Sequence, residues 1–201
     1  MGDQPPIAAV LAGGLGERLG GSKASATLAG RPLVEHPLGA AGEAGLEAIV
    51  VAKRSTVLPP LDVPVVYEPQ RPQHPLLGVI TALEFASQSA RLPGVVMLAC
   101  DMPFLTGPLL AWLAGLEGAV MASVDGRAQP LLSRLPVEAQ QALERALAER
   151  RSLRSAFASL APRVVGEREL SRFGDPARLC FNVNGPKDLR TASQWLDPVA
   201  G

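Results

Sequence analysis

Short runs of apolar residues recur along the first half of the 201-residue chain, each bounded by glycine, proline or charged positions. Apolar and polar residues do not alternate within these runs, which are Ile7–Ala12, Ala48–Ala52, Val63–Tyr67 and Val95–Ala99. Continuous apolar runs of this length are typical of strands that are buried on both faces of a parallel sheet. We therefore expect a parallel sheet at the centre of the fold.

Stretches with helical spacing separate these apolar runs. Leu33–Ala44 follows Pro32, which suits the first turn of a helix, and Val79–Ala90 places its apolar residues on one face. Alternating strands and helices predict right-handed βαβ crossovers and an α/β fold, a three-layer α/β/α sandwich with a mostly parallel central sheet. Ligands of such folds bind at the carboxyl ends of the strands.

The pattern changes in the second half of the chain. Two extended runs, Ala119–Ser123 and Gln129–Arg134, flank Asp125-Gly126, and Asp-Gly between extended runs predicts a hairpin. Three further helices are predicted at Gly107–Gly115, Val137–Arg150 and Pro186–Leu196. No long linker interrupts the chain, so we expect one domain over residues 1–201.

Composition narrows the class of protein. Apolar residues make up 47% of the chain, and 19 basic residues balance 19 acidic ones, so a folded core is expected and neither nucleic acid nor a membrane is an expected partner. The first residues have no basic segment followed by an apolar run, which predicts a cytoplasmic protein. Cys100 and Cys180, with two histidines, form no metal-ligand pattern and are interpreted as buried thiols.

The segment Leu11–Lys23, directly after the first apolar run, carries the strongest chemical signal. It holds five glycines within nine residues and ends on a lysine. Glycine lets a backbone approach a ligand closely, Arg18 can donate two hydrogen bonds to phosphate oxygens, and Lys23 can add a point charge. This combination predicts a site for a nucleoside triphosphate, and the alternative is a flexible surface turn.

Two better-known phosphate motifs are excluded. A P-loop needs Gly-Lys followed by Ser or Thr, whereas Gly21 is followed by Ser22-Lys23 in the inverted order. The dinucleotide motif would place its third glycine on Leu19, and Lys53 stands near the end of the second strand where an acidic ribose ligand is expected.

A carboxylate ends the fourth apolar run, in Cys100-Asp101-Met102-Pro103. A partly buried carboxylate at this place needs a cation or hydrogen-bond donors. Mg²⁺ fits, because proteins hold it with one or two carboxylates together with substrate phosphates. The alternative is that Asp101 caps the following turn.

Two more polar segments are candidates for contact with a ligand. In Asn182-Val183-Asn184-Gly185-Pro186, alternate positions would place both amides on one side of an extended segment, facing a ligand or metal. Asn184 could instead cap the last helix. In the loop Glu68–Gly78, His74 is interpreted as an exposed loop histidine, with a catalytic base as the alternative.

Together these motifs resemble those of the molybdenum cofactor guanylyltransferases of the nucleotidyltransferase superfamily. The matching segments are Leu11-Ala12-Gly13-Gly14 with Arg18, Gly20 and Lys23, then Pro75–Gly78, Cys100–Pro103 and Asn182–Pro186. The resemblance implies a Rossmann-like fold and the transfer of GMP from Mg²⁺-GTP to molybdopterin, with release of pyrophosphate. It also implies contact with molybdoenzymes or their chaperones. Within the single domain it implies a nucleotide-binding part at about 1–105 and a molybdopterin side at about 106–201.

The resemblance further implies roles for individual residues. Arg18, Lys23 and Asp101 would be catalytic, and Asp101 would hold Mg²⁺. The nucleotide would be bound by Leu11, Ala12, Gly13, Gly14, Lys23, Lys53, Glu68, Asp101, Asn182 and Asn184. Contributions to the pterin pocket are expected from Arg127, Gln129, Arg150 and Arg151.

The chain departs from the family pattern at four positions. Ser22 stands where the family usually has Asp, and Gly16 where it often has Ser. Lys53 and Glu68 replace Asn and Asp at positions associated with nucleoside recognition. The alternatives are therefore a molybdopterin cytidylyltransferase, another nucleotidyltransferase, or a nucleotide-binding regulator without activity. Gly13-Gly14 and the Asn-Val-Asn phrase favour guanine over cytosine.

Overall fold

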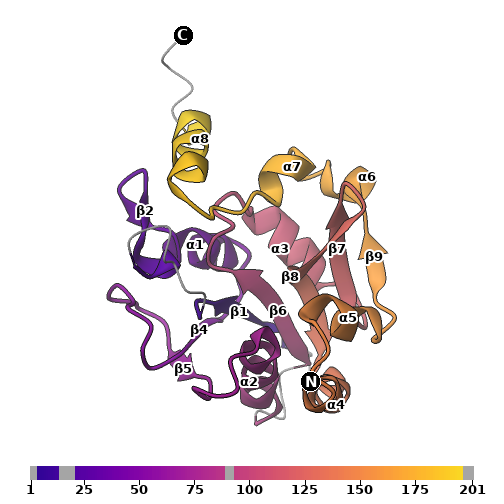
Figure 1. Ribbon diagram of the computed structural model, residues 1–201. Helices are drawn as coiled ribbons and strands as arrows, with labels where there is room; N and C mark the ends of the chain where they lie inside the picture. Colours follow the sequence, from indigo (N-terminus) through magenta and orange to yellow (C-terminus); the bar gives the residue numbers. More distant parts are fainter. Residues whose placement is uncertain (1–3, 14–20, 89–92, 197–201) are drawn as a thin grey trace.

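The computed structural model describes residues 4–13, 21–88 and 93–196 (Figure 1). One sheet of seven strands runs through the molecule, built from β1 (Ile7–Leu11), β4 (Ala48–Ala52), β5 (Val65–Tyr67), β6 (Gly94–Ala99), β7 (Val120–Val124), β8 (Arg127–Pro136) and β9 (Arg163–Val165). The strand order is β5-β4-β1-β6-β8-β7-β9. The first four are parallel, β8 is antiparallel to β6 and β7, and β9 is parallel to β7. The predicted, mostly parallel α/β architecture is confirmed.

Helices cover both faces of the sheet. They are α1 (Glu35–Glu43), α2 (Pro75–Ser87), α3 (Gly107–Ala114), α4 (Gln140–Ala148), α5 (Leu153–Ala158), α6 (Glu167–Leu170), α7 (Pro176–Leu179) and α8 (Pro186–Leu196). One core lies between the sheet and α1 and α3, and a second lies between the sheet and α2, α4 and α5. In β1, Ala8 and Val10 face the first core, whereas Ile7 and Ala9 face the second. Burial on both faces explains the unbroken apolar run of this strand.

The predicted hairpin is present. β7 and β8 pair in antiparallel fashion around Asp125 and Gly126, whose φ angles are +52° and +67°. Positive φ at both central residues is the geometry that Asp-Gly favours in a two-residue loop. The last helix begins and ends at the predicted residues, Pro186 and Leu196.

Other boundaries differ from the predictions. Pro32 does not begin a helix, because Arg31–Pro32 form β3, which pairs with β2 (Thr27–Leu28). Helix α2 begins at Pro75, four residues before the predicted start. The segment predicted as one helix from Val137 divides into a 3-10 turn, η3 (Val137–Ala139), and α4. Short elements such as β9, α5, α6 and α7 were not predicted, because so few residues show no periodicity.

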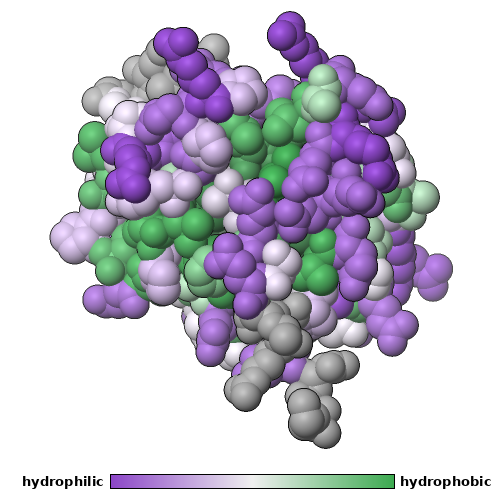
Figure 2. Space-filling view, turned by 90° about the horizontal axis from the view of Figure 1, so that it is seen from below, coloured by the Kyte–Doolittle hydropathy of each residue, from purple (hydrophilic) through white to green (hydrophobic). Residues whose placement is uncertain are grey.

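No helix within the described ranges is long and apolar enough to cross a membrane. On the face shown in Figure 2, separate hydrophobic patches are bordered by hydrophilic side chains.

Candidate active site

A pocket of about 440 Å³ opens at the carboxyl ends of the parallel strands. Each of β1, β4, β5 and β6 supplies residues at or just after its last position, and the start of α2 closes one side. The strand-end residues that line it are Leu11, Gly13, Val51, Lys53, Glu68, Ala99, Cys100 and Asp101. The sequence placed the site at this edge of the sheet, and the pocket lies there.

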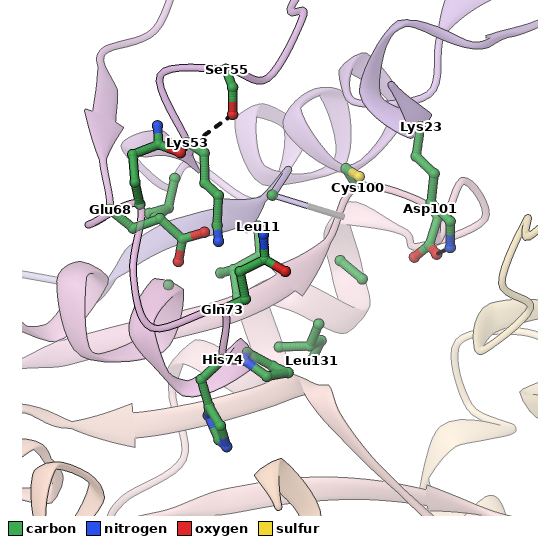
Figure 3. A pocket seen from close by; sticks show the side chains of 16 residues that line it. Leu11, Lys23, Lys53, Ser55, Glu68, Gln73, His74, Cys100, Asp101 and Leu131 are labelled. Atoms are coloured by element: carbon green, nitrogen blue, oxygen red, sulfur yellow. Dashed lines mark hydrogen bonds and ion pairs between the residues drawn. The ribbon is translucent and has the colours of Figure 1, made fainter. Parts of the chain in front are cut away.

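Lys23 and Asp101 lie together at one end of the pocket (Figure 3). Lys23, in the 3-10 turn η2 (Lys23–Ser25), donates to Asp101 Oδ2 at 2.7 Å and to Asn184 Oδ1 at 2.6 Å. The side chains of Lys23 and Asp101 are only 18% and 12% exposed, so water screens this ion pair weakly. We call Lys23, Asp101 and Asn184 the Lys23 triad.

Backbone hydrogen bonds fix where the triad lies. The Cys100 amide donates to Leu11 O at 3.2 Å, which extends the pairing of β1 and β6 up to the residue before Asp101. The Val183 amide donates to Asp101 O at 2.9 Å, so the segment before α8 is held against the end of β6. No described residue donates to Asp101 Oδ1, and the carboxylate is therefore paired with Lys23 rather than capping the next turn.

The two asparagines have different environments. Asn184 does not cap α8, because the first helical bond runs from Leu189 N to Gly185 O and the Asn184 side chain accepts from Lys23. Asn182 Nδ2 donates to Cys180 O at 2.9 Å, and Asn184 Nδ2 donates to Asn182 O at 3.3 Å. The amide of Asn182 is thus tied to its own chain segment instead of joining the triad.

The other end of the pocket brings Lys53, Glu68 and Gln73 together, with their polar groups extending toward a common space (Figure 3). Glu68 is buried at 8% exposure, and its carboxylate lies in a gap left by two glycines. A Cβ on Gly13 would lie 2.7 Å from Glu68 Oε1, and one on Gly78 would lie 3.1 Å from Oε2. Burial raises the pKa of Glu68, and the nearby charge of Lys53 opposes this shift.

His74 is more than a loop residue. Its Nδ1 accepts from the Leu76 amide at 3.2 Å, so the side chain caps the N-terminus of α2, and the residue is half-buried at the pocket rim. The prediction of an exposed histidine is therefore wrong. Its position directly before Pro75, a residue suited to the first turn, was the signal that could have shown the cap.

The two cysteines are confirmed as buried thiols. Both are free, and burial raises the pKa of Cys100 and of Cys180 to about 12. Thiols with such pKa values carry almost no thiolate near neutral pH and are poor nucleophiles.

Several other residues predicted for the site do not line the pocket or lie outside the described residues. Gly14 and Arg18 lie outside the described residues, and Ala12 is fully buried beside the pocket residue Leu11. Arg127, Gln129, Arg150 and Arg151 are not among the residues that line this pocket. Gln70, Gln73 and Leu131 line it without having been predicted. The two glutamines belong to the Pro-rich loop before α2, whose place after a strand was an available signal.

The oxygens around Lys23 form a donor set that suits a hard cation. Across the described part of the chain, no group of three or more His, Cys, Asp or Glu could hold a metal ion without other ligands. Asp101 contributes one carboxylate, and its Oδ2 and Asn184 Oδ1 already converge on a positive charge, the Lys23 ammonium. A Mg²⁺ ion would fit such oxygens if substrate phosphates completed its coordination. The pocket thus combines a charged end suited to phosphates with a second end that offers both a donor and acceptors.

Comparison with known proteins agrees with these features. Residues 8–164 match the family model of the MobA-like NTP transferase domain. The molybdenum cofactor guanylyltransferase of Cereibacter sphaeroides is 34% identical, over 93% of this chain and 95% of the relative. That of Rhizobium johnstonii is 31% identical, over 94% of this chain and 92% of the relative.

Solved structures share the fold. Molybdopterin-guanine dinucleotide biosynthesis protein A from Archaeoglobus fulgidus has a TM-score of 0.77 at 24% identity and covers 96% of this chain and 100% of its own. The 2-C-methyl-D-erythritol 4-phosphate cytidylyltransferase from Thermus thermophilus has a TM-score of 0.66 at 19% identity, over 94% of this chain and 98% of its own. From its match to the domain model and its identity with these relatives over nearly the whole length, the chain belongs to the molybdenum cofactor guanylyltransferase (MobA) family of nucleotidyltransferase enzymes.

Proposed function

We propose that this enzyme transfers GMP from Mg²⁺-GTP to molybdopterin and thereby forms the guanine dinucleotide cofactor and pyrophosphate. The observation that carries the proposal is the Lys23 triad, in which an ammonium is held by a carboxylate just after β6 and by an amide just before α8. The relatives from Cereibacter and Rhizobium are named for guanylyl transfer in molybdenum cofactor formation, which supports the choice of substrates.

The reaction exchanges one phosphorus–oxygen bond for another. An oxygen of the terminal phosphate of molybdopterin attacks the α-phosphorus of GTP, and the bond from that phosphorus to the bridging oxygen of the β-phosphate breaks. Pyrophosphate carries away the bonding electrons. No protein nucleophile is needed, in keeping with the buried thiol of Cys100, the cysteine that lines the pocket, whose pKa is raised by burial. The protein contributes positioning and charge stabilisation.

Lys23 is the residue best placed to bind the triphosphate. Its ammonium lies at the charged end of the pocket, and both of its described partners are oxygens that the substrate's phosphates can replace. Gly13 and Gly14, with Arg18, would supply backbone amides and a guanidinium beside the same phosphates.

Asp101 would hold Mg²⁺, with the Asn184 amide oxygen close by and Asn182 as a further candidate. When bound, the ion neutralises charge that builds up on the phosphates during transfer. In this arrangement Lys23 shifts its hydrogen bonds from Asp101 to phosphate oxygens, which leaves the carboxylate available.

Glu68 and Lys53 would select the base. Guanine presents neighbouring donors at N1 and N2 beside the acceptor O6, which matches a carboxylate acceptor and an ammonium donor. Cytosine presents one amino group beside two acceptors and leaves Glu68 with fewer donors. Leu11 would pack against the base or ribose, because it lines the pocket between the two polar ends.

The second substrate would lie toward residues 106–201. Leu131 of β8 lines the pocket, so the second half of the chain borders the site. Arg127 and Gln129 are on the same strand and, with Arg150 and Arg151, stay candidates for the pterin side. Hand-over of the product to molybdoenzymes or their chaperones also stays a prediction.

Pyrophosphate release in the presence of molybdopterin, with GTP and CTP compared at several Mg²⁺ concentrations, tests the proposal. We expect GTP to be preferred and Asp101→Asn to lose activity by on the order of a hundredfold, because a nearly isosteric amide lacks the charge that attracts the metal. Circular dichroism checks that the variant is folded. Equal use of CTP would reject the base assignment, and parental activity of Asp101→Asn at every Mg²⁺ concentration would remove this residue from the metal site.

A further inference from the structure

A small third core lies next to the Lys23 triad, separate from the two cores that flank the sheet. Its buried residues are Leu28, Leu33, Phe104, Val183 and Ala192, and Phe181, Leu189 and Trp195 pack against them. We call this set the aromatic core. It is where α8 and the β2-β3 pair meet, beside α1 in Figure 1.

The aromatic core draws on each of the three chain segments that carry a triad residue. Leu28 follows Lys23 by five positions, and Phe104 follows Asp101 by three. Asn184 lies between Val183, which is fully buried in this core, and helix α8. Segments that lie 78 and 161 residues apart in the sequence are thus held together in two ways, by the hydrogen bonds of the triad and by the packing of the aromatic core.

Three rings and one guanidinium hold the aromatic core together. The ring centroids lie 4.8 Å apart for Phe181–Trp195, 5.4 Å for Phe104–Trp195 and 6.3 Å for Phe104–Phe181, all tilted or edge-on. Arg178 Cζ lies 4.8 Å from the Phe104 ring centroid and 5.8 Å from that of Trp195. Its Nη2 also donates to Trp195 O at 2.9 Å, near the end of α8. Such contacts are directional, so they restrain orientation as well as burying area.

We propose that Trp195 and Arg178 are positioning residues of the active site, which hold the segment of Asn184 against the end of β6 so that the Asn184 amide stays beside Asp101. The inference rests on the proposed function for its kinetic readout only. Neither side chain lines the pocket, so any effect on the reaction must pass through the aromatic core. A displacement of about 1 Å in a catalytic group can cost on the order of a hundredfold in rate.

The chain contains a matched control for this proposal. Its other tryptophan, Trp112 of α3, packs on Phe173 with centroids 5.2 Å apart, and Arg172 Cζ lies 5.7 Å from the Trp112 ring. The chemistry is that of the aromatic core, a tryptophan, a phenylalanine and an arginine, but this cluster contains no residue adjacent to a triad residue. Trp112→Ala therefore removes a similar ring without disturbing the triad.

The experiment compares Trp195→Ala, Trp195→Phe, Arg178→Met and Trp112→Ala in three measurements. These are kcat and KM for pyrophosphate release, the Kd of GTP with and without Mg²⁺, and the free energy of unfolding in urea. We expect Trp195→Ala to lower kcat by on the order of a hundredfold and to reduce the gain in GTP affinity that Mg²⁺ gives. Trp195→Phe should keep most of the parental kcat and of the gain in GTP affinity. Trp112→Ala should change kcat by less than about twofold, even if its free energy of unfolding falls as much as that of Trp195→Ala.

Each outcome supports or overturns the proposal. Parental kcat and parental Mg²⁺ dependence in folded Trp195→Ala would overturn it, as would an equal loss in Trp112→Ala. If Trp195→Ala does not fold, Arg178→Met decides, because it keeps an apolar side chain and removes the guanidinium; we expect about a tenfold loss of kcat, and a parental value would contradict the proposal. If the unmodified protein transfers no GMP, the proposed function fails, and the comparison of GTP affinities still tests the positioning role.

Discussion

Two glycines that line the pocket shape the end of it that holds Glu68. Gly13 and Gly78 leave the gap in which the Glu68 carboxylate lies, and neither glycine has the positive φ that would itself require glycine. The requirement is therefore steric. It arises from close approach of a buried side chain to the backbone, as expected where a ligand site is packed tightly.

Gly13→Ala should weaken GTP binding while the protein remains folded. The new Cβ would lie 2.7 Å from Glu68 Oε1, so the carboxylate must move away from its place in the pocket. We expect the KM for GTP to rise by about tenfold, because binding of the base is lost in the ground and transition states alike. Gly166→Ala is the matched control, since nothing lies within 4 Å of its Cβ and its φ is negative. A KM for Gly13→Ala equal to that of the control would contradict the role assigned to Glu68.

Glu68→Gln should make the protein more stable at neutral pH. Burial raises the pKa of Glu68 above its ordinary value of 4.5, so the folded protein binds this proton more tightly than the unfolded chain does. The free energy of unfolding then falls as the pH rises through the interval between the two values and stays lower above it. The neutral amide avoids this loss.

Urea unfolding of parent and variant from about pH 4 to about pH 8 checks the expected sign, which is a stability difference that grows in favour of Glu68→Gln as the pH rises. Glu68→Gln should nevertheless bind GTP more weakly than the parent, because the variant lacks the charged acceptor proposed to bind the base. A stability difference that shrinks with rising pH would show that the carboxylate is stabilised in the folded protein.

For single residues, the sequence was sufficient to predict that polar side chains directly after the strands gather at one site. Asp101 and Lys23 stood out because a charged residue directly after an apolar run or a glycine-rich loop needs a partner. Their mutual contact, and the burial of Glu68, depend on how distant segments pack and could not be predicted from local pattern. The helix cap made by His74 was missed because the start of α2 was predicted too late.

At the element scale, long and strongly patterned segments were predictable. The buried strands β1 and β4 were predicted because their apolar residues continue without interruption over five residues, and α8 because Pro186 suits the first turn of a helix. The predicted strand at Val63–Tyr67 is shorter and less buried than expected, since β5 covers Val65–Tyr67 at the edge of the sheet. The β2-β3 pair is two residues per strand and is stabilised by the aromatic core, in which Leu28 is buried. Its existence depends on tertiary contacts that no local pattern records.

The same substitution should have opposite effects in a turn and in a helix. Gly126 has a φ of +67° in the β7-β8 hairpin, where an alanine costs about 1 kcal/mol in the free energy of unfolding. Gly42 lies in the last turn of α1, where alanine is favoured over glycine by about 0.5 kcal/mol. Nothing lies within 4 Å of a Cβ at either position, so the two stability changes reflect backbone conformation and not new side-chain contacts.

Urea unfolding of Gly126→Ala and Gly42→Ala measures both effects, with the first variant less stable and the second more stable than the parent. If both changes had the same sign, the backbone conformation assigned to one of these glycines would be wrong.

At the scale of the whole molecule, the order of strands beyond β6 was the least predictable part of the fold. The hairpin could be predicted, but β8 rather than β7 pairs with β6, and β9 joins the far edge after two helices. This arrangement places Leu131 of β8 at the pocket, so that both halves of the chain border one site. The Lys23 triad likewise joins residues from the beginning, middle and end of the sequence.

Such a site makes the activity a property of the complete sheet together with the last helix. The nucleotide would be held by the parallel half of the sheet, and α8 with the aromatic core would keep Asn184 in place. Loss of either part should abolish transfer, although some nucleotide binding could survive on the parallel strands.

Isotope labelling distinguishes transfer of GMP from GTP to molybdopterin at the Lys23 triad from any other use of GTP. GTP labelled at the α-phosphate and GTP labelled at the γ-phosphate are incubated separately with Mg²⁺, molybdopterin and the enzyme, and the products are separated. We predict that the α-label enters the pterin-containing product, that the γ-label leaves in pyrophosphate, and that Lys23→Ala and Asp101→Asn suppress both. The absence of α-label from the pterin product in an otherwise folded, GTP-binding protein would contradict the account.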